Sequence, residues 1–246
     1  MQGWSAAEAV NRELEGASAE QILQWTAREF GSDIALSCSF GGGSGMVLVD
    51  LVARLHIPAE VFFLDTGLLF PETYALVGEV KRRYGIDVTA IRPRLSLEEQ
   101  ASQHGPALWA SDPDLCCYWR KVEPMERALA GKRAWISGIR RDQSSTRAAV
   151  PVAAWDDAYG VVKVNPLASW TEADVQAYIK THHVPYNPLA DQGYASIGCV
   201  PCTRPVQIGE HARSGRWAGF GKTECGLHVR EAVRPAALAV SSSSGS

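Results

Sequence analysis

The chain has 246 residues, 46% of them hydrophobic, and a net charge of −3 from 24 Lys and Arg against 27 Asp and Glu. These values predict a globular protein with a full core and argue against a fibrous, disordered or small disulfide-rich class. The acidic balance argues against nucleic-acid binding. The longest apolar run, at 46–52, is too short for a membrane span, and no secretory signal is visible. We therefore expect a cytoplasmic protein with reduced cysteines.

Predicted strands and helices alternate along the chain. In order, the patterns predict a helix at 18–30, a strand at 33–39, a helix at 46–56, a strand at 60–64, a helix at 71–84, a strand at 86–91, a helix at 116–130, a strand at 134–137, a short apolar segment at 161–164 and a helix at 171–181. This alternation predicts an α/β fold with a mainly parallel sheet and flanking helices.

The pattern changes after residue 185, where Gly, Pro, Arg and Cys dominate and regular periodicity disappears. We expect a single domain over 1–234, with a core at about 31–184 and a loop-rich segment at about 185–230 that needs a metal, a ligand or the core to order it. The serine-rich end at 235–246 is expected to be a disordered tail.

Three predicted strand ends carry groups that suit an anionic ligand. The first strand runs into a glycine-rich loop at 40–45, which is neither a Walker A loop nor a Rossmann fingerprint. The second ends at Asp65, Thr66 and Gly67, and the fourth runs into 138–147, which holds three arginines. Ligands of open α/β sheets bind beyond the carboxyl ends of strands. These loops therefore predict a phosphate or sulfate site, although each alone also fits an ordinary turn.

Four of the six cysteines form two close pairs, Cys116-Cys117 and Cys199-x-x-Cys202. Four thiolates suit either a structural zinc or a [4Fe–4S] cluster. Adjacent cysteines do not both reach one tetrahedral ion easily, whereas a cluster presents separate irons, so the pairs favour the cluster. Cys38 lies in a predicted strand and is expected to be a core thiol.

The last cysteine, Cys225, lies in Glu224-Cys225-Gly226-Leu227-His228. A cysteine three residues before a histidine, in a glycine-containing segment, can act as an accessible nucleophile where neighbouring cations favour its thiolate. From this spacing alone, Cys225 could instead be a structural thiol with no catalytic role.

Together these motifs resemble those of assimilatory sulfonucleotide reductases, and among them the iron–sulfur adenylyl-sulfate (APS) reductases. The resemblance spans about 33–230 and is carried most specifically by the order of Cys-Cys, C-x-x-C and Glu-Cys-Gly-Leu-His. It implies an adenine-nucleotide α-hydrolase-like fold. It also implies reduction of APS to sulfite and AMP in sulfate assimilation toward cysteine, with thioredoxin or a glutaredoxin-like dithiol protein as reductant, in a chain that could be a homo-oligomer.

The same resemblance implies roles for individual residues. Cys225 becomes the nucleophile that forms an S-sulfocysteine intermediate. Cys116, Cys117, Cys199 and Cys202 become the ligands of one [4Fe–4S] cluster per chain. The expected substrate contacts are Lys121, Arg140, Arg147, Arg213, Arg216, His228, Asp65, Thr66, Gly67, Ser39 and Gly41.

Two departures from the family pattern and three alternatives accompany this interpretation. The loop at 41–45 lacks the acidic pair of many family members, and Asp112-Pro113-Asp114 stands where some have a histidine. A phosphoadenylyl-sulfate (PAPS) reductase is the nearest alternative. An ATP pyrophosphatase-type thiolation enzyme is disfavoured because no Asp follows the glycines until Asp50. A non-catalytic iron–sulfur redox sensor would leave the Cys225 segment without a purpose.

Overall fold

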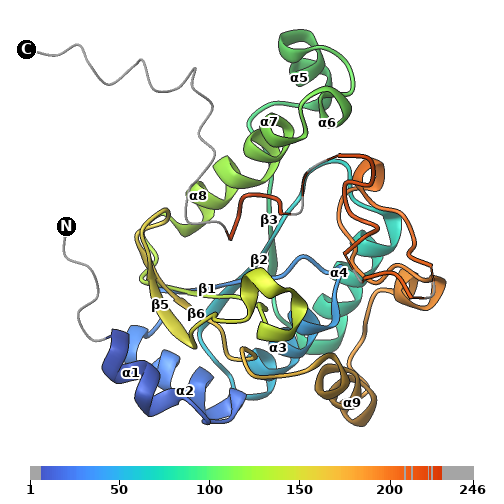
Figure 1. The fold of residues 1–246 in the computed structure, drawn as a ribbon. Coiled ribbons are helices and arrows are strands. Elements are labelled where there is room, and N and C mark those ends of the chain that lie inside the picture. Colours follow the sequence, from blue (N-terminus) through green and yellow to red (C-terminus); the bar gives the residue numbers. More distant parts are fainter. Residues whose placement is uncertain (1–6, 208, 212, 221, 223, 229–246) are drawn as a thin grey trace, which may run out of the picture.

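The computed structural model describes residues 7–207, 209–211, 213–220, 222 and 224–228. Its centre is a six-stranded sheet in the order β3-β2-β1-β4-β6-β5 (Figure 1). The strands are β1 (Ile34–Ser37), β2 (Ala59–Leu64), β3 (Val88–Ile91), β4 (Ala134–Ile136), β5 (Ala153–Asp156) and β6 (Val161–Val164). All neighbours pair parallel except β5 and β6, which pair antiparallel. The predicted α/β class is confirmed. The predicted tail at 235–246 lies outside the described residues.

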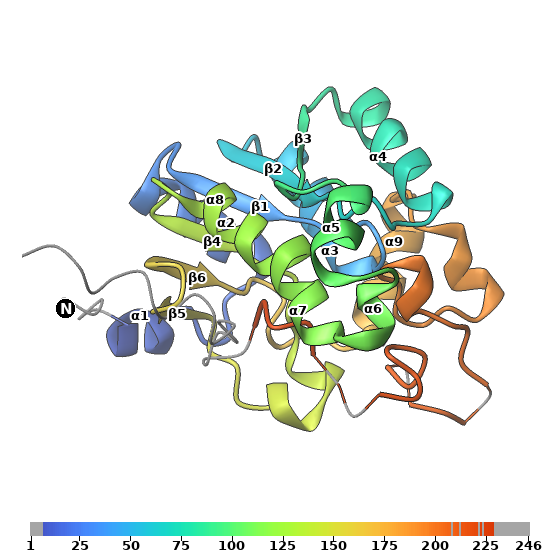
Figure 2. The same ribbon diagram turned by 90° about the horizontal axis from the view of Figure 1, so that it is seen from above.

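Helices flank this sheet (Figure 2). They are α1 (Ala7–Leu14), α2 (Ala19–Phe30), α3 (Gly43–Arg54), α4 (Pro71–Tyr84), α5 (Leu97–His104), α6 (Leu108–Ser111), α7 (Pro113–Cys117), α8 (Glu123–Leu129) and α9 (Glu172–His182). The predicted capping box of Ser18 and Gln21 starts α2. No helix in the described part of the chain combines the length and apolar character that a membrane crossing requires.

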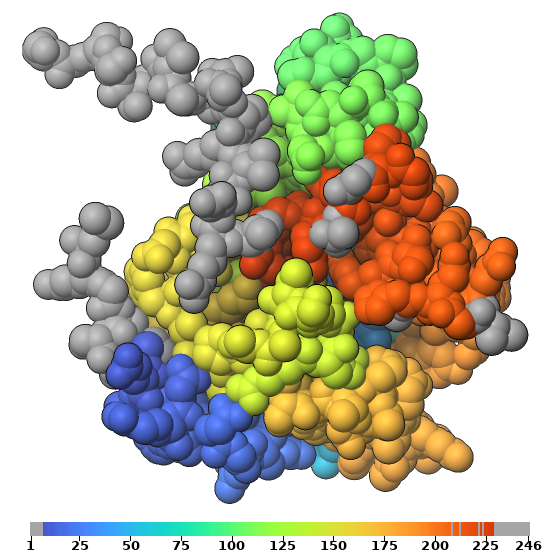
Figure 3. Space-filling model, viewed as in Figure 1, coloured from blue at the N-terminus to red at the C-terminus, as the bar shows by residue number. Residues whose placement is uncertain are grey.

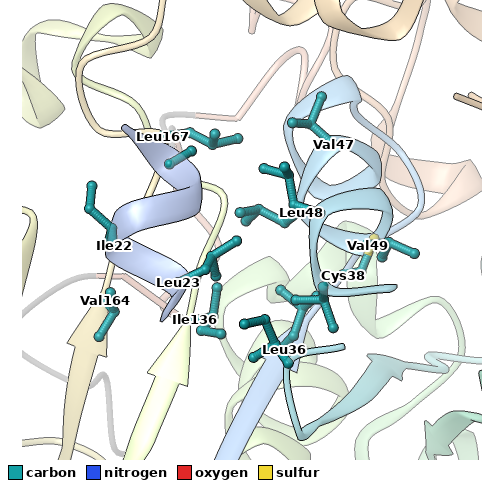
Figure 4. Packing of buried hydrophobic residues seen from close by; sticks show 14 of the residues in the cluster. Ile22, Leu23, Leu36, Cys38, Val47, Leu48, Val49, Ile136, Val164 and Leu167 are labelled. Carbon is teal, nitrogen blue, oxygen red and sulfur yellow. The ribbon is translucent and has the colours of Figure 1, made fainter. Parts of the chain in front are cut away.

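The two faces of the sheet are packed unequally. Successive residues of a strand point to opposite faces, so Ile34 and Leu36 of β1 join a large apolar cluster formed with α2, α3, α4 and α9. Figure 4 shows this cluster between α2, α3 and the strands. Ala35 and Trp135 point to the other face, where a smaller cluster packs against Met125 and the rest of α8.

Cys38 belongs to the large cluster and is 2% exposed. Burial raises the pKa of its thiol to about 12. The structure therefore confirms that Cys38 is a core thiol, and its side chain lies among those of Leu36 and Val49 (Figure 4).

The predicted helix at 116–130 is not uniform. The chain begins α7 at Pro113, passes through a π-helical turn at Tyr118–Val122 and continues as α8. Such π turns inside helices are frequent at functional sites because they change which side chains share a face. Sequence periodicity did not predict this turn, nor the strand β5.

Candidate active site

The two cysteine pairs line one pocket although more than 80 residues separate them. Cys116 and Cys117 end α7, which begins where the side chain of Asp112 accepts a hydrogen bond from the Leu115 N–H at 2.9 Å. Cys199 and Cys202 come from the loop after α9. The other lining residues are Leu68, Trp109, Pro113, Arg120 and Lys121.

The Asp65-Thr66-Gly67 loop holds the Cys199 side of this pocket. The Val200 N–H donates to the Leu68 carbonyl at 2.7 Å, and Thr66 Oγ1 lies 3.3 Å from Cys199 Sγ. Arg120 Nε donates to the Thr66 carbonyl at 2.6 Å. Predicted substrate contacts at Thr66 and Gly67 therefore border the cysteine pocket itself.

Asp65 is buried beneath this loop and is fully engaged. Its Oδ1 accepts from the hydroxyl of Tyr74 at 2.7 Å and from the Gly67 N–H at 3.1 Å, and its Oδ2 accepts from Arg92 Nε at 3.1 Å. Burial opposes ionisation of the carboxyl, but these hydrogen bonds outweigh it and lower the pKa of Asp65. In this structure Asp65 shapes the loop.

The environment of the cysteine pocket disfavours free thiolates. Burial, followed by repulsion from neighbouring thiols, raises the pKa of Cys116 to about 12 and of Cys202 to about 11. Burial likewise raises the pKa of Cys117. Such thiols are expected to ionise only when a cationic centre replaces their protons. Within the described residues, no three His, Cys, Asp or Glu side chains meet in a way that suits a single metal ion.

Lys121 connects this pocket to Cys225. Burial alone would lower the pKa of Lys121, but the facing thiols of Cys199, Cys117 and Cys225 more than offset it and raise that pKa. The ammonium group is therefore a permanent positive charge between the cysteine pocket and the predicted nucleophile.

Three cations surround the buried indole of Trp217. The side chains of Arg216, Lys222 and Lys121 lie 4.5, 5.7 and 6.0 Å from its ring centroid. Arg216 also packs against Gly198, where a Cβ would meet its guanidinium at 2.2 Å. Trp217 is not among the residues expected at the site; an aromatic residue directly after an arginine was the available signal.

The Cys225 segment lies against the body of the protein. Figure 3 shows the red C-terminal residues between the green helices and the yellow-green loop that follows β4. Both oxygens of the Glu224 carboxylate accept from Arg147 Nη2 at 2.8 Å, and Oε2 also accepts from Arg213 Nη2 at 3.1 Å. Two predicted anion-binding arginines therefore converge on one carboxylate next to Cys225.

His228 ends the described part of this segment. Its ring stacks on that of Trp135 at 5.4 Å between centroids and 8° between planes. Burial, followed by the positive charges of Lys163, Arg147 and Arg213, lowers the pKa of His228 well below 6.5. The imidazole is therefore neutral at physiological pH. Lys163, which contacts it, was absent from the expected site.

The glycine-rich loop and Arg140 lie at the start of α3. A Cβ on Gly41 would lie 2.6 Å from the Ile197 carbonyl oxygen, so only glycine fits there, and the Gly41 N–H donates to Ser39 Oγ at 3.4 Å. Arg140 is buried and donates to Asp142, Glu172 and Ser44. Its guanidinium thus ties the arginine-rich loop to α3 and α9.

Comparison with known proteins identifies the family of this chain. The model of the phosphoadenosine phosphosulfate reductase domain matches residues 33–205. The chain belongs to this family. A relative from Salinibacter ruber named adenosine 5′-phosphosulfate reductase is 48% identical, over 92% of this chain and 90% of its own. Another of that name, from Streptomyces coelicolor, is 49% identical over 90% and 93%.

Solved structures agree on the fold of this family member. A phosphoadenylyl-sulfate reductase from Candida auris is 35% identical, with a TM-score of 0.74 over 83% of this chain and 98% of its own. An FMN adenylyltransferase from Candida glabrata, 17% identical, superposes with a TM-score of 0.56 over 85% and 70%. The second likeness concerns the fold alone.

Proposed function

We propose that this chain is an oxidoreductase that reduces adenosine 5′-phosphosulfate to sulfite and AMP, with Cys225 as the nucleophile. The observation that carries the proposal is the setting of Cys225, a half-buried thiol directly after Glu224, whose carboxylate is held by Arg147 and Arg213. A strongly anionic substrate needs such a cationic setting before an anionic thiolate can approach it. The relatives named adenosine 5′-phosphosulfate reductase support this substrate class.

The first step forms one bond and breaks one. The Cys225 thiolate attacks the sulfur of the sulfate group, a Cys–S–SO₃⁻ bond forms, and the sulfur–oxygen bond to the phosphate breaks with AMP leaving as the anion. Lys121 and Arg216 are candidate partners of these negative charges, together with Arg147 and Arg213 when Glu224, which both contact, releases them. His228 offers a neutral ring that can donate a hydrogen bond.

The second step needs two electrons, which a thioredoxin-like dithiol protein supplies. Its first thiolate attacks Cys225 Sγ and expels sulfite, and its second thiol resolves the mixed disulfide and restores the Cys225 thiol. We also propose a cytoplasmic setting, which keeps such dithiols reduced. Gly226 is expected to let the segment from Gly221 to His228 close over the substrate and reopen; Gly221 lies outside the described residues.

We further propose that Cys116, Cys117, Cys199 and Cys202 hold a [4Fe–4S] cluster. What supports it is their convergence on one pocket beside two cations, Arg120 and Lys121. When bound, the cluster would supply a charged centre that replaces the thiol protons and fixes the orientation of Lys121. Anaerobic analysis should give about four iron and four sulfide per chain, and zinc without sulfide would contradict the cluster.

Sulfite formation tests the proposed reaction. The purified holoenzyme is given either APS or PAPS, side by side, with reduced thioredoxin. We expect APS to be preferred, because the two relatives named adenosine 5′-phosphosulfate reductase are 48% and 49% identical to this chain, whereas the PAPS reductase from Candida auris is 35% identical. A kcat/KM that favours PAPS tenfold or more would overturn the substrate assignment, and no sulfite from either would overturn the function.

A further inference from the structure

Lys163 is a nearly buried cation that has no role in the reaction proposed above. It lies in β6 between two buried valines and pairs in register with Trp135 of β4. Its side chain is 12% exposed and crosses the indole of Trp135, with Nζ 4.3 Å from the ring centroid. A lysine in this position loses most of its hydration, so its remaining partners decide what it does.

The closest polar partner of Lys163 is the predicted active-site histidine. Nζ lies 3.1 Å from His228 Nδ1, whereas the Asp156 carboxylate is 3.9 Å away. An ammonium group can only donate, so Nδ1 must accept and the proton of the neutral ring is on Nε2. Lys163 holds one edge of the imidazole and Trp135 covers one face. The ring therefore has a fixed position and a fixed tautomer, with its proton on Nε2.

Several charges face Lys163 from the elements around it. They are Asp156 of β5, Arg147 of the loop after β4, and Glu224 and Cys225 of the C-terminal segment. Burial, with a contribution from Arg147, lowers the pKa of Lys163 to about 8, while the three acidic groups oppose that shift. Cys225 is one of these groups, so the charged lysine and a thiolate on Cys225 would attract each other.

We propose that Lys163 is a positioning residue for the nucleophile, which it serves by holding His228 through Nδ1 and by presenting its positive charge to Cys225. This inference rests on the proposed function, in which Cys225 attacks the substrate. In this proposal Lys163 differs from the cations expected to bind substrate, because Lys163 holds the 224–228 segment in place.

Hydrogen exchange of the holoenzyme tests the docking without substrate. In Lys163→Met, amides of the peptide covering 224–228 should exchange at least tenfold faster than in the wild type. Lys163→Arg keeps a charged donor and should stay within about threefold. The matched control is Lys81→Met, which removes an exposed lysine paired with Asp87. Unchanged exchange in Lys163→Met would overturn the docking role.

The pH profile of Cys225 sulfonation in a single turnover tests the charge. Lys163 loses its positive charge as pH rises through about 8, so the wild-type rate should fall above that pH. In Lys163→Arg the guanidinium stays charged, and this fall should move to higher pH or disappear. An identical alkaline limb in both proteins would refute the charge role. If no sulfocysteine forms in any variant, the proposed function fails, while the exchange result still decides the docking.

Discussion

The two faces of the sheet are held by different kinds of contact. On one face, α2, α3, α4 and α9 pack against the strands through a continuous apolar cluster that includes Leu48, which is completely buried. On the other face, α8 covers only part of the sheet, and the Cys225 segment lies beside it. Apart from Leu227 and the stacking of His228 on Trp135, the contacts of that segment named above are polar or charged, centred on Glu224 and His228.

This difference indicates how one domain combines a rigid frame with a segment that must move. Apolar burial is non-directional and is lost only when the fold is lost. A largely buried ion pair adds little net stability, because its partners lose their hydration, and it can be exchanged for contacts to an anionic substrate. The thinly covered face is therefore suited to reversible docking of the nucleophile, and the following changes test that contrast.

The largest expected effect comes from removing the nucleophile. Cys225→Ser should fold normally, because the half-buried thiol contributes little packing, but its sulfite formation should fall at least 10³-fold since a serine hydroxyl stays protonated. Sulfite assay and thermal unfolding measure the two effects. The control is Cys38→Ala, which should lose stability and keep turnover. Normal turnover by Cys225→Ser would contradict the proposed chemistry.

A matched pair of leucines compares the two faces directly. Leu48→Ala creates a cavity in the large cluster and should lower the free energy of unfolding by about 3 kcal/mol. Leu227→Ala, on the thinly covered face, should cost about 1 kcal/mol or less yet slow Cys225 sulfonation. Denaturant unfolding and single-turnover kinetics measure the pair. Equal losses of stability would mean that both faces are packed alike.

Glu224→Gln weakens the docking contacts without changing the shape of the side chain. The neutral amide of glutamine cannot form ion pairs with Arg147 and Arg213. We therefore expect roughly tenfold slower sulfonation of Cys225. Glu210→Gln removes a similar but exposed ion pair with Arg204 and serves as the control. A lower KM with an undiminished rate would instead show that Glu224 merely competes with substrate for the arginines.

The smallest effect is a pH dependence of stability from His228. Its pKa lies well below 6.5 in the folded protein because of burial and nearby cations, whereas the unfolded chain takes up a proton near that value. Its contribution to stability is therefore present above about pH 6.5 and declines below it. As the pH falls below about 6.5, the wild type should lose stability relative to its own value at neutral pH. His228→Gln should lack this loss, and identical pH profiles would contradict the burial of a neutral imidazole.

The sequence predicted the frame well because its signals are local. Alternating apolar runs and capping residues such as Ser18 depend on neighbours a few positions away, and the predicted α/β class is confirmed. The strand β5 was missed because its four residues lack clear alternation, and it is completed by pairing with β6. The π-helical turn after Cys117 was missed because its spacing differs little from that of an α-helix.

Some features of the candidate site could likewise be predicted from local sequence, whereas others could not. Cysteine spacing and the motif around Cys225 could be recognised along the chain, and the structure brings the two cysteine pairs to one pocket. The roles of Lys163 and Trp217 depend on contacts between segments far apart in sequence, which no local pattern encodes. Arg140 shows the converse, since an arginine in an anion-binding pattern donates to protein acceptors in the folded chain.

The central claim is that Cys225 carries the sulfonate group between substrate and reductant. The direct measurement is the intact mass of the holoenzyme after mixing with APS in the absence of any thiol, followed by peptide mapping. We expect one added SO₃, about 80 Da, on Cys225, and its loss when reduced thioredoxin is added. No adduct, or an adduct on Cys38 in place of Cys225, would contradict the account.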